Sequence, residues 1–108
     1  MTPRQGERQA VVVPLAAEID LTNYERVYDR LYTTLVSGAP VVIADFTSTW
    51  FCDCASLRRL LAVQQQAAAQ GRQLRLVIPP GSPVRRLAVL LGLDGQPYIY
   101  ASRREASA

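Results

Sequence analysis

The sequence lacks histidine and lysine altogether, and among its 108 residues it has one tryptophan, one methionine and two cysteines. Without histidine there is no imidazole base for a catalytic triad and no imidazole ligand for a metal ion. Two cysteines are too few to complete a tetrahedral metal site or to build a framework of disulfides. These absences exclude histidine-based catalysis and favour a reducing, intracellular location, which we expect to be the cytoplasm.

Long hydrophobic runs are also missing. No stretch approaches the length of a membrane-spanning helix, and residues 1–10 are polar, without the apolar centre of a signal peptide. We therefore expect no membrane insertion. The 12 basic residues are all arginine, and against 9 acidic residues they give a net charge of +3. Because they occur as scattered pairs and not as one dense patch, we expect no nucleic acid partner.

What the chain does have is a hydrophobic fraction of 49%, which is enough to form a packed core. A chain of this length is expected to form one domain. We place that domain at residues 11–108 and predict that residues 1–10 form a flexible N-terminal segment.

Four short segments rich in β-branched, aliphatic or aromatic residues predict strands. They are residues 11–15, 41–44, 74–78 and 98–100. Segment 41–44 is apolar at every position, which is typical of a central strand covered on both faces. In the first segment Pro14 has no N–H to donate, which predicts an edge position or a bulge.

Apolar residues at helical spacing separate these segments. Thr22 and Glu25 have the spacing of a capping box and predict the start of the first helix. Asp53 is a candidate N-cap of the second helix, and Ser82, which is followed by proline, of the third. The arginine- and alanine-rich tail favours a short further helix. This alternation of strands and helices predicts an α/β fold built from parallel βαβ units.

Two local sequences within this order of elements resemble those of a known family. Residues 17–20 read Ala-Glu-Ile-Asp, and residues 45–57 begin with aspartate and end in Asp-Cys-Ala-Ser-Leu. They are similar to the Gly-Glu-Leu/Ile-Asp and Asp-Ser-Ser-Gly-Leu sequences of the STAS domain, typified by bacterial anti-sigma factor antagonists. The resemblance extends over residues 11–100. It implies an α/β fold in which a mixed sheet of four to five strands packs with three to four helices.

The resemblance also implies a role in transcription regulation by partner switching. In the family, an anti-sigma factor with kinase activity phosphorylates the second serine of Asp-Ser-Ser-Gly, and the added charge breaks its complex with the antagonist. Asp53 matches the family's aspartate. Cys54 replaces the first serine, Ala55 replaces the phosphoacceptor and Ser56 replaces the glycine. Because Ala55 has no hydroxyl group, the usual switch cannot operate at this position.

Three explanations of this departure stay open. In the first, which we favour, the domain is a binding module fixed in an unphosphorylated-like state. In the second, the acceptor has moved to Ser56, where a rotation of about 100° around the helix would aim it poorly at a kinase. In the third, Cys54 has a redox role, because thiols at helix N-termini ionise more readily.

The first explanation predicts a surface that binds an anti-sigma factor or a related kinase-type ATPase, with a homodimer left open. Trp50 lies in the loop before the second helix and is expected to be an interface hot spot, whereas Phe51 matches a position that is usually buried. Arg58 and Arg59 are expected to pair with acids of the partner. The predicted surface comprises Asp20, Thr22, Asn23, Ser48, Thr49, Trp50, Asp53, Cys54, Ala55, Ser56, Arg58 and Arg59.

Two other functions are compatible with the sequence. STAS-like domains also serve as non-catalytic accessory or scaffold subunits of stress-sensing assemblies and lipid-transport ATPase complexes, and large assemblies in size-exclusion chromatography would favour that role. Asp20, Asp45 and Asp53 are expected at one edge of the sheet, where carboxylates can bind a divalent cation or transfer protons. A simpler role for Asp20 and Asp53 is to cap helices. We therefore expect no metal, no cofactor and no enzymatic activity.

Overall fold

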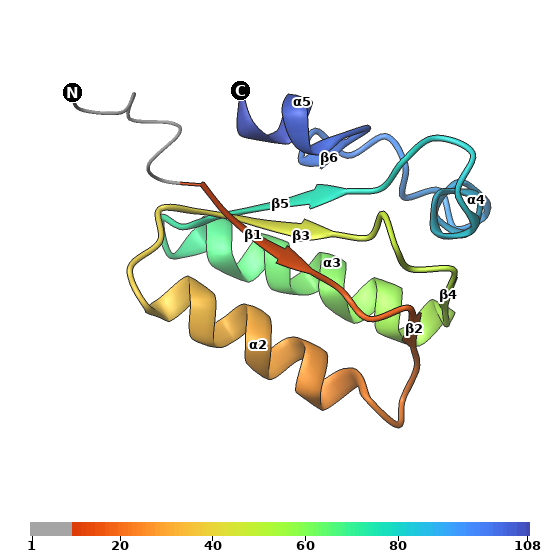
Figure 1. The fold of residues 1–108 in the computed structure, drawn as a ribbon, viewed down its shortest axis with the longest axis horizontal. Coiled ribbons are helices and arrows are strands. Elements are labelled where there is room, and N and C mark those ends of the chain that lie inside the picture. The colour runs from red at the N-terminus through yellow and green to blue at the C-terminus, as the bar shows by residue number, and fades with distance from the viewer. Residues whose placement is uncertain (1–9) are drawn as a thin grey trace.

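The computed structural model describes residues 10–108, which form strands and helices in layers (Figure 1). The strands are β1 (Ala10–Pro14), β2 (Glu18–Ile19), β3 (Val41–Asp45), β4 (Phe51–Cys52), β5 (Gln73–Val77) and β6 (Ile99–Tyr100). The helices are α2 (Tyr24–Val36), α3 (Cys54–Ala69), α4 (Pro83–Leu90) and α5 (Arg103–Ser107). Residues 1–9 of the predicted flexible segment lie outside the described residues, and its last residue, Ala10, begins β1.

The main sheet has the strand order β1-β3-β5-β6, and each strand is parallel to its neighbours. Helices α2, α3 and α4 connect these neighbours in turn, which is the βαβ arrangement that the alternation of elements predicts. The α/β class and the numbers of sheet strands and helices are confirmed. Every strand pair within residues 10–108 is parallel, so the antiparallel pairing of a mixed sheet is not found in this part of the chain.

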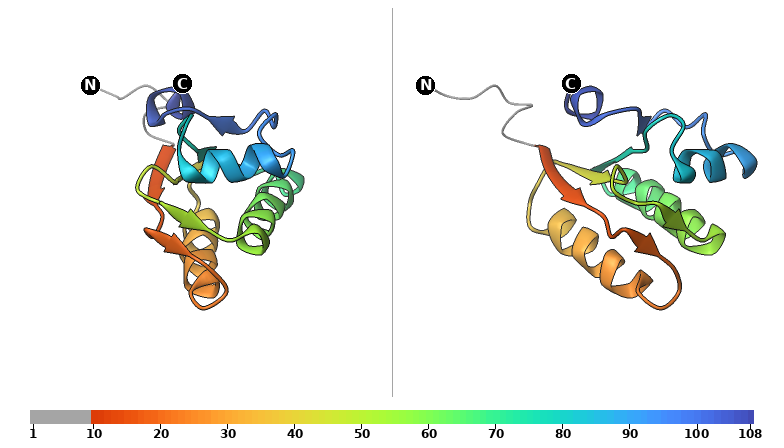
Figure 2. Two further views of the ribbon diagram at one scale, coloured as in Figure 1. Left: turned by 90° about the vertical axis from the view of Figure 1, so that its right-hand side faces the viewer. Right: turned by 45° about the vertical axis from the view of Figure 1, so that its right-hand side comes forward.

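The main sheet is covered on both faces. Helices α2 and α3 lie along one face and α5 lies against the other, while α4 packs near β4 at the end of the sheet (Figures 1 and 2). The larger core cluster fills the space between the sheet and the two long helices, and a smaller one, which includes Ile43, Val77 and Ala106, lies under α5. All five residues of β3 are buried, as expected for a central strand.

Two predicted helix starts are confirmed by their caps. The Asp53 carboxylate accepts a hydrogen bond from the Ser56 N–H at 2.8 Å, and the Ser82 hydroxyl accepts one from the Arg85 N–H at 3.1 Å. After α3 the chain turns at Gly71, whose φ of 73° is readily adopted only by glycine. The ends of the four predicted strands differ from the observed ends by at most one residue, which is within the usual uncertainty of such boundaries.

The predicted capping box at the first helix is wrong. Asn23 is the N-cap residue of α2 and makes no side-chain capping bond. The Thr22 hydroxyl donates to the Asp20 carboxylate at 2.5 Å. Thr22 lies one residue before the N-cap and is bonded within the turn after β2, not to the helix.

Candidate partner-binding surface

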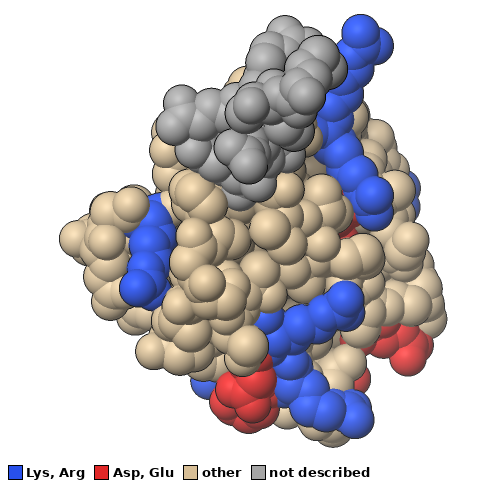
Figure 3. Space-filling model, turned by 60° about the vertical axis from the view of Figure 1, so that its left-hand side comes forward, with Lys and Arg blue, Asp and Glu red and all other residues tan. Residues whose placement is uncertain are grey.

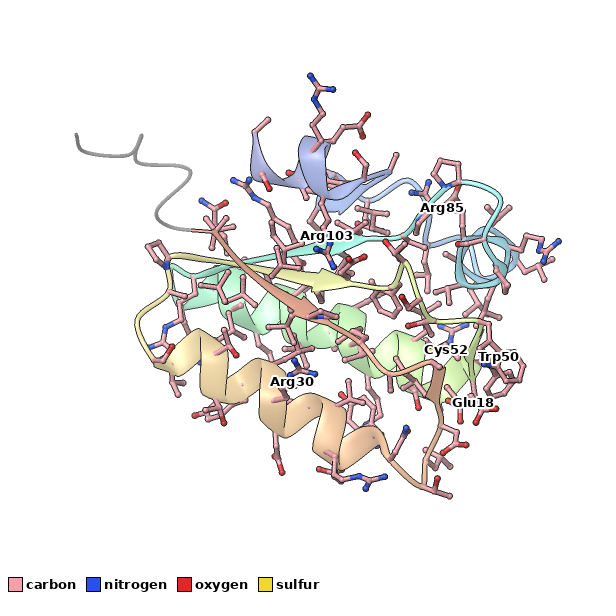
Figure 4. All side chains as sticks on the ribbon, in the orientation of Figure 1. Glu18, Arg30, Trp50, Cys52, Arg85 and Arg103 are labelled. Atoms are coloured by element: carbon pink, nitrogen blue, oxygen red, sulfur yellow. The ribbon has the colours of Figure 1, made fainter. Side chains whose placement is uncertain are left out.

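Strands β2 and β4 hold together the segments that the sequence marks as functional. Glu18 pairs with Phe51 and Ile19 pairs with Cys52. The Trp50 N–H donates to the carbonyl oxygen of Ala17 at 2.9 Å. The turn after β2, the loop before β4 and the start of α3 consequently lie at one end of the molecule, where Figure 4 also shows Glu18 and Trp50.

The turn after β2 is a closed network of short hydrogen bonds. The Asp20 carboxylate accepts from both the N–H and the hydroxyl of Thr22, and these bonds lower the pKa of Asp20 below its ordinary value. The Asn23 side chain accepts from the Asp20 N–H at 2.9 Å and donates to the Glu18 carbonyl oxygen at 2.7 Å. The sequence suggested that Asp20 caps a helix, but its carboxylate is bonded within the turn. Asp20 organises this turn, which presents Leu21 with 65% of its surface exposed.

The loop before β4 presents two aromatic rings. Trp50 is 59% exposed, in agreement with its expected position in the loop. Phe51 is 44% exposed, so the expectation that it is buried is wrong: β4 alternates, and Cys52 takes the inward position. The two rings lie 6.2 Å apart. Thr49, which we expected on the surface, is buried, and its hydroxyl donates to the Ala16 carbonyl oxygen at 2.8 Å.

At the start of α3, Cys54 and Ala55 are exposed, whereas Ser56 is completely buried. The expectations that Ser56 lies at a contact and that it substitutes for the phosphoacceptor therefore do not fit its position, because a kinase cannot reach it in this conformation. The sequence held a signal for this: Ser56 lies four residues before the buried Leu60, on the inward side of the helix.

The Ser56 hydroxyl oxygen is buried and has no hydrogen-bond partner among the described residues. A buried polar group without a partner destabilises the folded state. We expect Ser56→Ala to raise the free energy of unfolding by about 1 kcal/mol, measured by urea denaturation. The matched control is Ser48→Ala at an exposed site, which should change little. A loss of stability on Ser56→Ala would show that the hydroxyl is satisfied.

The two arginines of α3 have different surroundings, although both are exposed. The Arg59 guanidinium forms an ion pair with Glu25 at 3.2 Å and lies 4.0 Å from the centre of the Tyr24 ring. It is thus engaged within the chain and joins α3 to α2, which the sequence did not predict. Arg58 is therefore the better candidate for a contact with a partner.

The two cysteines also differ. Cys52 is buried, and burial, together with the nearby Asp53 and Cys54, raises the pKa of its thiol to about 12. It is therefore protonated at neutral pH and a poor nucleophile. Cys54 is exposed, and the two thiols are not joined by a disulfide.

The three aspartates have separate partners and do not form one site. Asp20 and Asp53 are bonded within the turn and the helix start described above. Asp45 is 2% exposed and accepts hydrogen bonds from Thr47 and from Arg103 Nε at 2.5 Å. Within residues 10–108 no group of three or more cysteine or acidic side chains is arranged to hold a metal ion.

Asp45 is expected to stabilise the fold in a pH-dependent way. Burial opposes its ionisation, but the bonds from Thr47 and Arg103 outweigh that effect and lower its pKa below 3.8. Its contribution is therefore present above pH 3.8 and is lost as the pH falls through the folded-state pKa. We expect Asp45→Asn to lower the free energy of unfolding by about 1–3 kcal/mol at neutral pH. In urea titrations the difference from the wild type should narrow in acid; a constant difference would contradict this.

The exposed residues brought together at this end define what we call the candidate surface. Leu21 was not predicted from the sequence, although an apolar residue inside a polar turn was an available signal, and Phe51 was expected to be buried. The candidate surface comprises Leu21, Thr22, Ser48, Trp50, Phe51, Cys54, Ala55 and Arg58.

On the face drawn in Figure 3, basic side chains lie in separate groups among uncharged residues. No helix within residues 10–108 has the length and apolar character needed to cross a membrane.

Comparisons with known proteins agree with this architecture. Residues 3–106 match the family model of the STAS domain. No curated protein sequence matches the chain significantly. Among solved structures, the anti-sigma factor antagonist SpoIIAA in its unphosphorylated form is 26% identical, with a TM-score of 0.68, over 92% of this chain and 85% of that chain.

Two further structures are similar. The Bacillus cell fate determinant SpoIIAA in the phosphorylated form is 25% identical, with a TM-score of 0.64, over 92% of this chain and 88% of that chain. An anti-sigma factor antagonist from Mycobacterium paratuberculosis is 20% identical, with a TM-score of 0.76, over 91% of this chain and 82% of that chain. At that lower identity the likeness shows the fold alone.

Proposed function

The chain belongs to the STAS domain family, and from this premise we propose that it is an anti-sigma factor antagonist-like regulator that acts in the cytoplasm. It binds a protein partner, an anti-sigma factor or a related kinase-type ATPase, and carries out no catalysis itself. The similarity to SpoIIAA supports this role. The observation that carries it is the exposed aromatic pair, Trp50 and Phe51, beside the exposed start of α3.

The contact surface is the candidate surface, with Asp53 and the turn of Asp20 and Asn23 as its rigid support. Large exposed apolar side chains beside a charged residue are common at the centre of protein interfaces. Here Trp50 and Phe51 supply apolar area, and Arg58 supplies a charge that an acidic group of the partner can pair with. The hydrogen bonds between β2 and β4 fix these groups before binding, which reduces the entropy lost in the complex.

Binding is not switched off by phosphorylation in this proposal. Ala55, which corresponds to the usual phosphoacceptor of the family, is exposed but has no hydroxyl, and the neighbouring Ser56 hydroxyl is buried. SpoIIAA has been described in both phosphorylated and unphosphorylated forms. We propose that this chain keeps the binding function and lacks that switch.

The test begins with co-purification of the partner from the native cell and continues with a titration of the two pure proteins. Ala55→Glu places a negative charge at the centre of the contact and is expected to weaken affinity roughly tenfold or more. Asp53→Lys, which removes the cap of α3, should also weaken it. The matched control is Gln65→Glu, which adds the same charge at an exposed position of α3 outside the candidate surface. Unchanged affinity in the first two variants would reject the proposal.

Phosphorylation is tested separately. The chain and its purified partner are incubated with ATP and examined by mass spectrometry. We expect no phosphate on the wild type, while Ala55→Ser should accept one if the partner is a kinase. Phosphate on Ser56 of the wild type would contradict the proposed loss of the switch.

A further inference from the structure

A groove of about 430 Å³ lies between the end of β1 and the first half of α2. One wall is formed by residues 14–16, and the other by Asn23, Arg26, Val27 and Arg30. Leu15 and Val27 are themselves buried and give the groove an apolar floor. Its volume falls in the range of sites that bind small molecules. None of the exposed residues of the candidate surface lines it.

Two arginines stand at the rim of this groove. Arg26 and Arg30 are four positions apart on α2 and therefore lie one above the other on the same side of the helix. Arg30 Nη1 donates to the Pro14 carbonyl oxygen at 3.2 Å, which holds its guanidinium between α2 and β1 (Figure 4). Within residues 10–108, ion pairs are made by Arg59 and Arg103 but by neither arginine of the groove.

We propose that this groove binds a small anionic amphiphile, a molecule with one carboxylate, sulfonate or phosphate head group on an apolar body. The head group lies against Arg26 and Arg30, whose remaining N–H donors match the oxygens of such anions. The apolar body covers Leu15 and Val27. The ligand needs both its head group and its apolar body. A small hydrated anion would leave the apolar floor uncovered, and a neutral molecule would leave the two arginine charges unpaired.

The size and position of the groove favour a free small molecule as the occupant. The groove is bounded on two sides, by the end of an outer strand and by a helix. Its length is limited to two turns of α2, which suits a short chain or a single ring. This proposal goes beyond the proposed function and needs no protein partner for its test.

The probe is octanoate, titrated into the 108-residue chain by isothermal calorimetry, with neutral octanamide as the matched ligand. We expect saturable binding of octanoate at one site and about tenfold or weaker binding of octanamide. Arg26→Gln combined with Arg30→Gln should weaken octanoate binding about tenfold or more. The control is Arg86→Gln combined with Arg104→Gln, which removes two exposed arginines elsewhere and should leave octanoate binding unchanged.

Location and folding are checked by backbone NMR. Octanoate should shift the signals of residues 14–16 and 23–30. Because Arg30 also holds the Pro14 carbonyl, Arg26→Gln alone provides a variant that leaves that bond intact, and it should still weaken binding. The proposal would be overturned if octanoate showed no saturable binding up to about 1 mM. It would also be overturned if the double variant bound octanoate as tightly as the wild type, or if the NMR shifts were confined to α3. Arginine-dependent binding to phosphatidylglycerol vesicles without binding of free octanoate would overturn the free small molecule as the source.

Discussion

Trp50→Ala is expected to weaken the affinity of the chain for its partner by about 2 kcal/mol or more, which is roughly 30-fold. Tryptophan is the residue most often found to dominate interface energies, because it buries a large apolar area with few rotatable bonds. The Trp50 ring is more than half exposed, and the backbone beneath it is fixed to Ala17, so it is prepared for contact before binding. The measurement is a titration with the co-purified partner.

The matched control for Trp50 is Tyr32→Ala. Tyr32 is 50% exposed and lies in the second half of α2, outside the candidate surface. Its replacement also removes an exposed aromatic ring, so any general effect on solubility or folding should appear in both variants. If Trp50→Ala leaves affinity unchanged, or if Tyr32→Ala weakens it as much, the candidate surface has been placed wrongly.

Phe46→Ala is expected to lower the free energy of unfolding by about 3–5 kcal/mol. Phe46 is the largest of the fully buried side chains. Its N–H donates to the Val77 carbonyl oxygen and its carbonyl accepts from the Thr49 N–H, each at 2.9 Å. The buried side chain and these backbone bonds together anchor the beginning of the loop that presents Trp50. Urea denaturation followed by circular dichroism measures the loss.

The chain provides its own control in the second phenylalanine. Phe51 is 44% exposed, and Phe51→Ala should cost less than about 1 kcal/mol. A loss of 3–5 kcal/mol is a large share of the stability of a typical small domain. If Phe46→Ala does not fold, Phe46→Leu keeps part of the ring's volume and should still destabilise measurably more than Phe51→Ala. Equal effects at the two positions would contradict the burial described.

Much of the fold could be predicted because its signals are local. The run of apolar residues in β3, the alternation of strands with helices, and the caps at Asp53 and Ser82 are each set by a few neighbouring residues. The two local sequences that resemble the STAS domain lie at the ends of strands that the structure brings together. The resemblance to the family therefore predicted that these segments contribute to one surface.

The rest depended on contacts between distant segments. Strands β2 and β4 have two residues each, too few for an alternating pattern, and they form only because they pair with each other. Burial at Thr49 and exposure at Phe51 follow from that pairing. At the groove beside α2, Arg30 bonds to Pro14, which lies 16 positions earlier in the chain. No local sequence pattern predicts such a contact.

The strand order β1-β3-β5-β6 repeats the order of the chain, so each strand emerging from the ribosome finds its neighbour already made. The sheet can grow by one strand and one helix at a time during synthesis, without waiting for a distant segment. One contact does have to wait for a distant segment: the ion pair between Arg103 and Asp45 spans 58 positions. A nascent chain that still lacks α5 therefore has one face of its sheet, around Ile43 and Val77, uncovered. That face is closed only once α5 has been made and has packed against it.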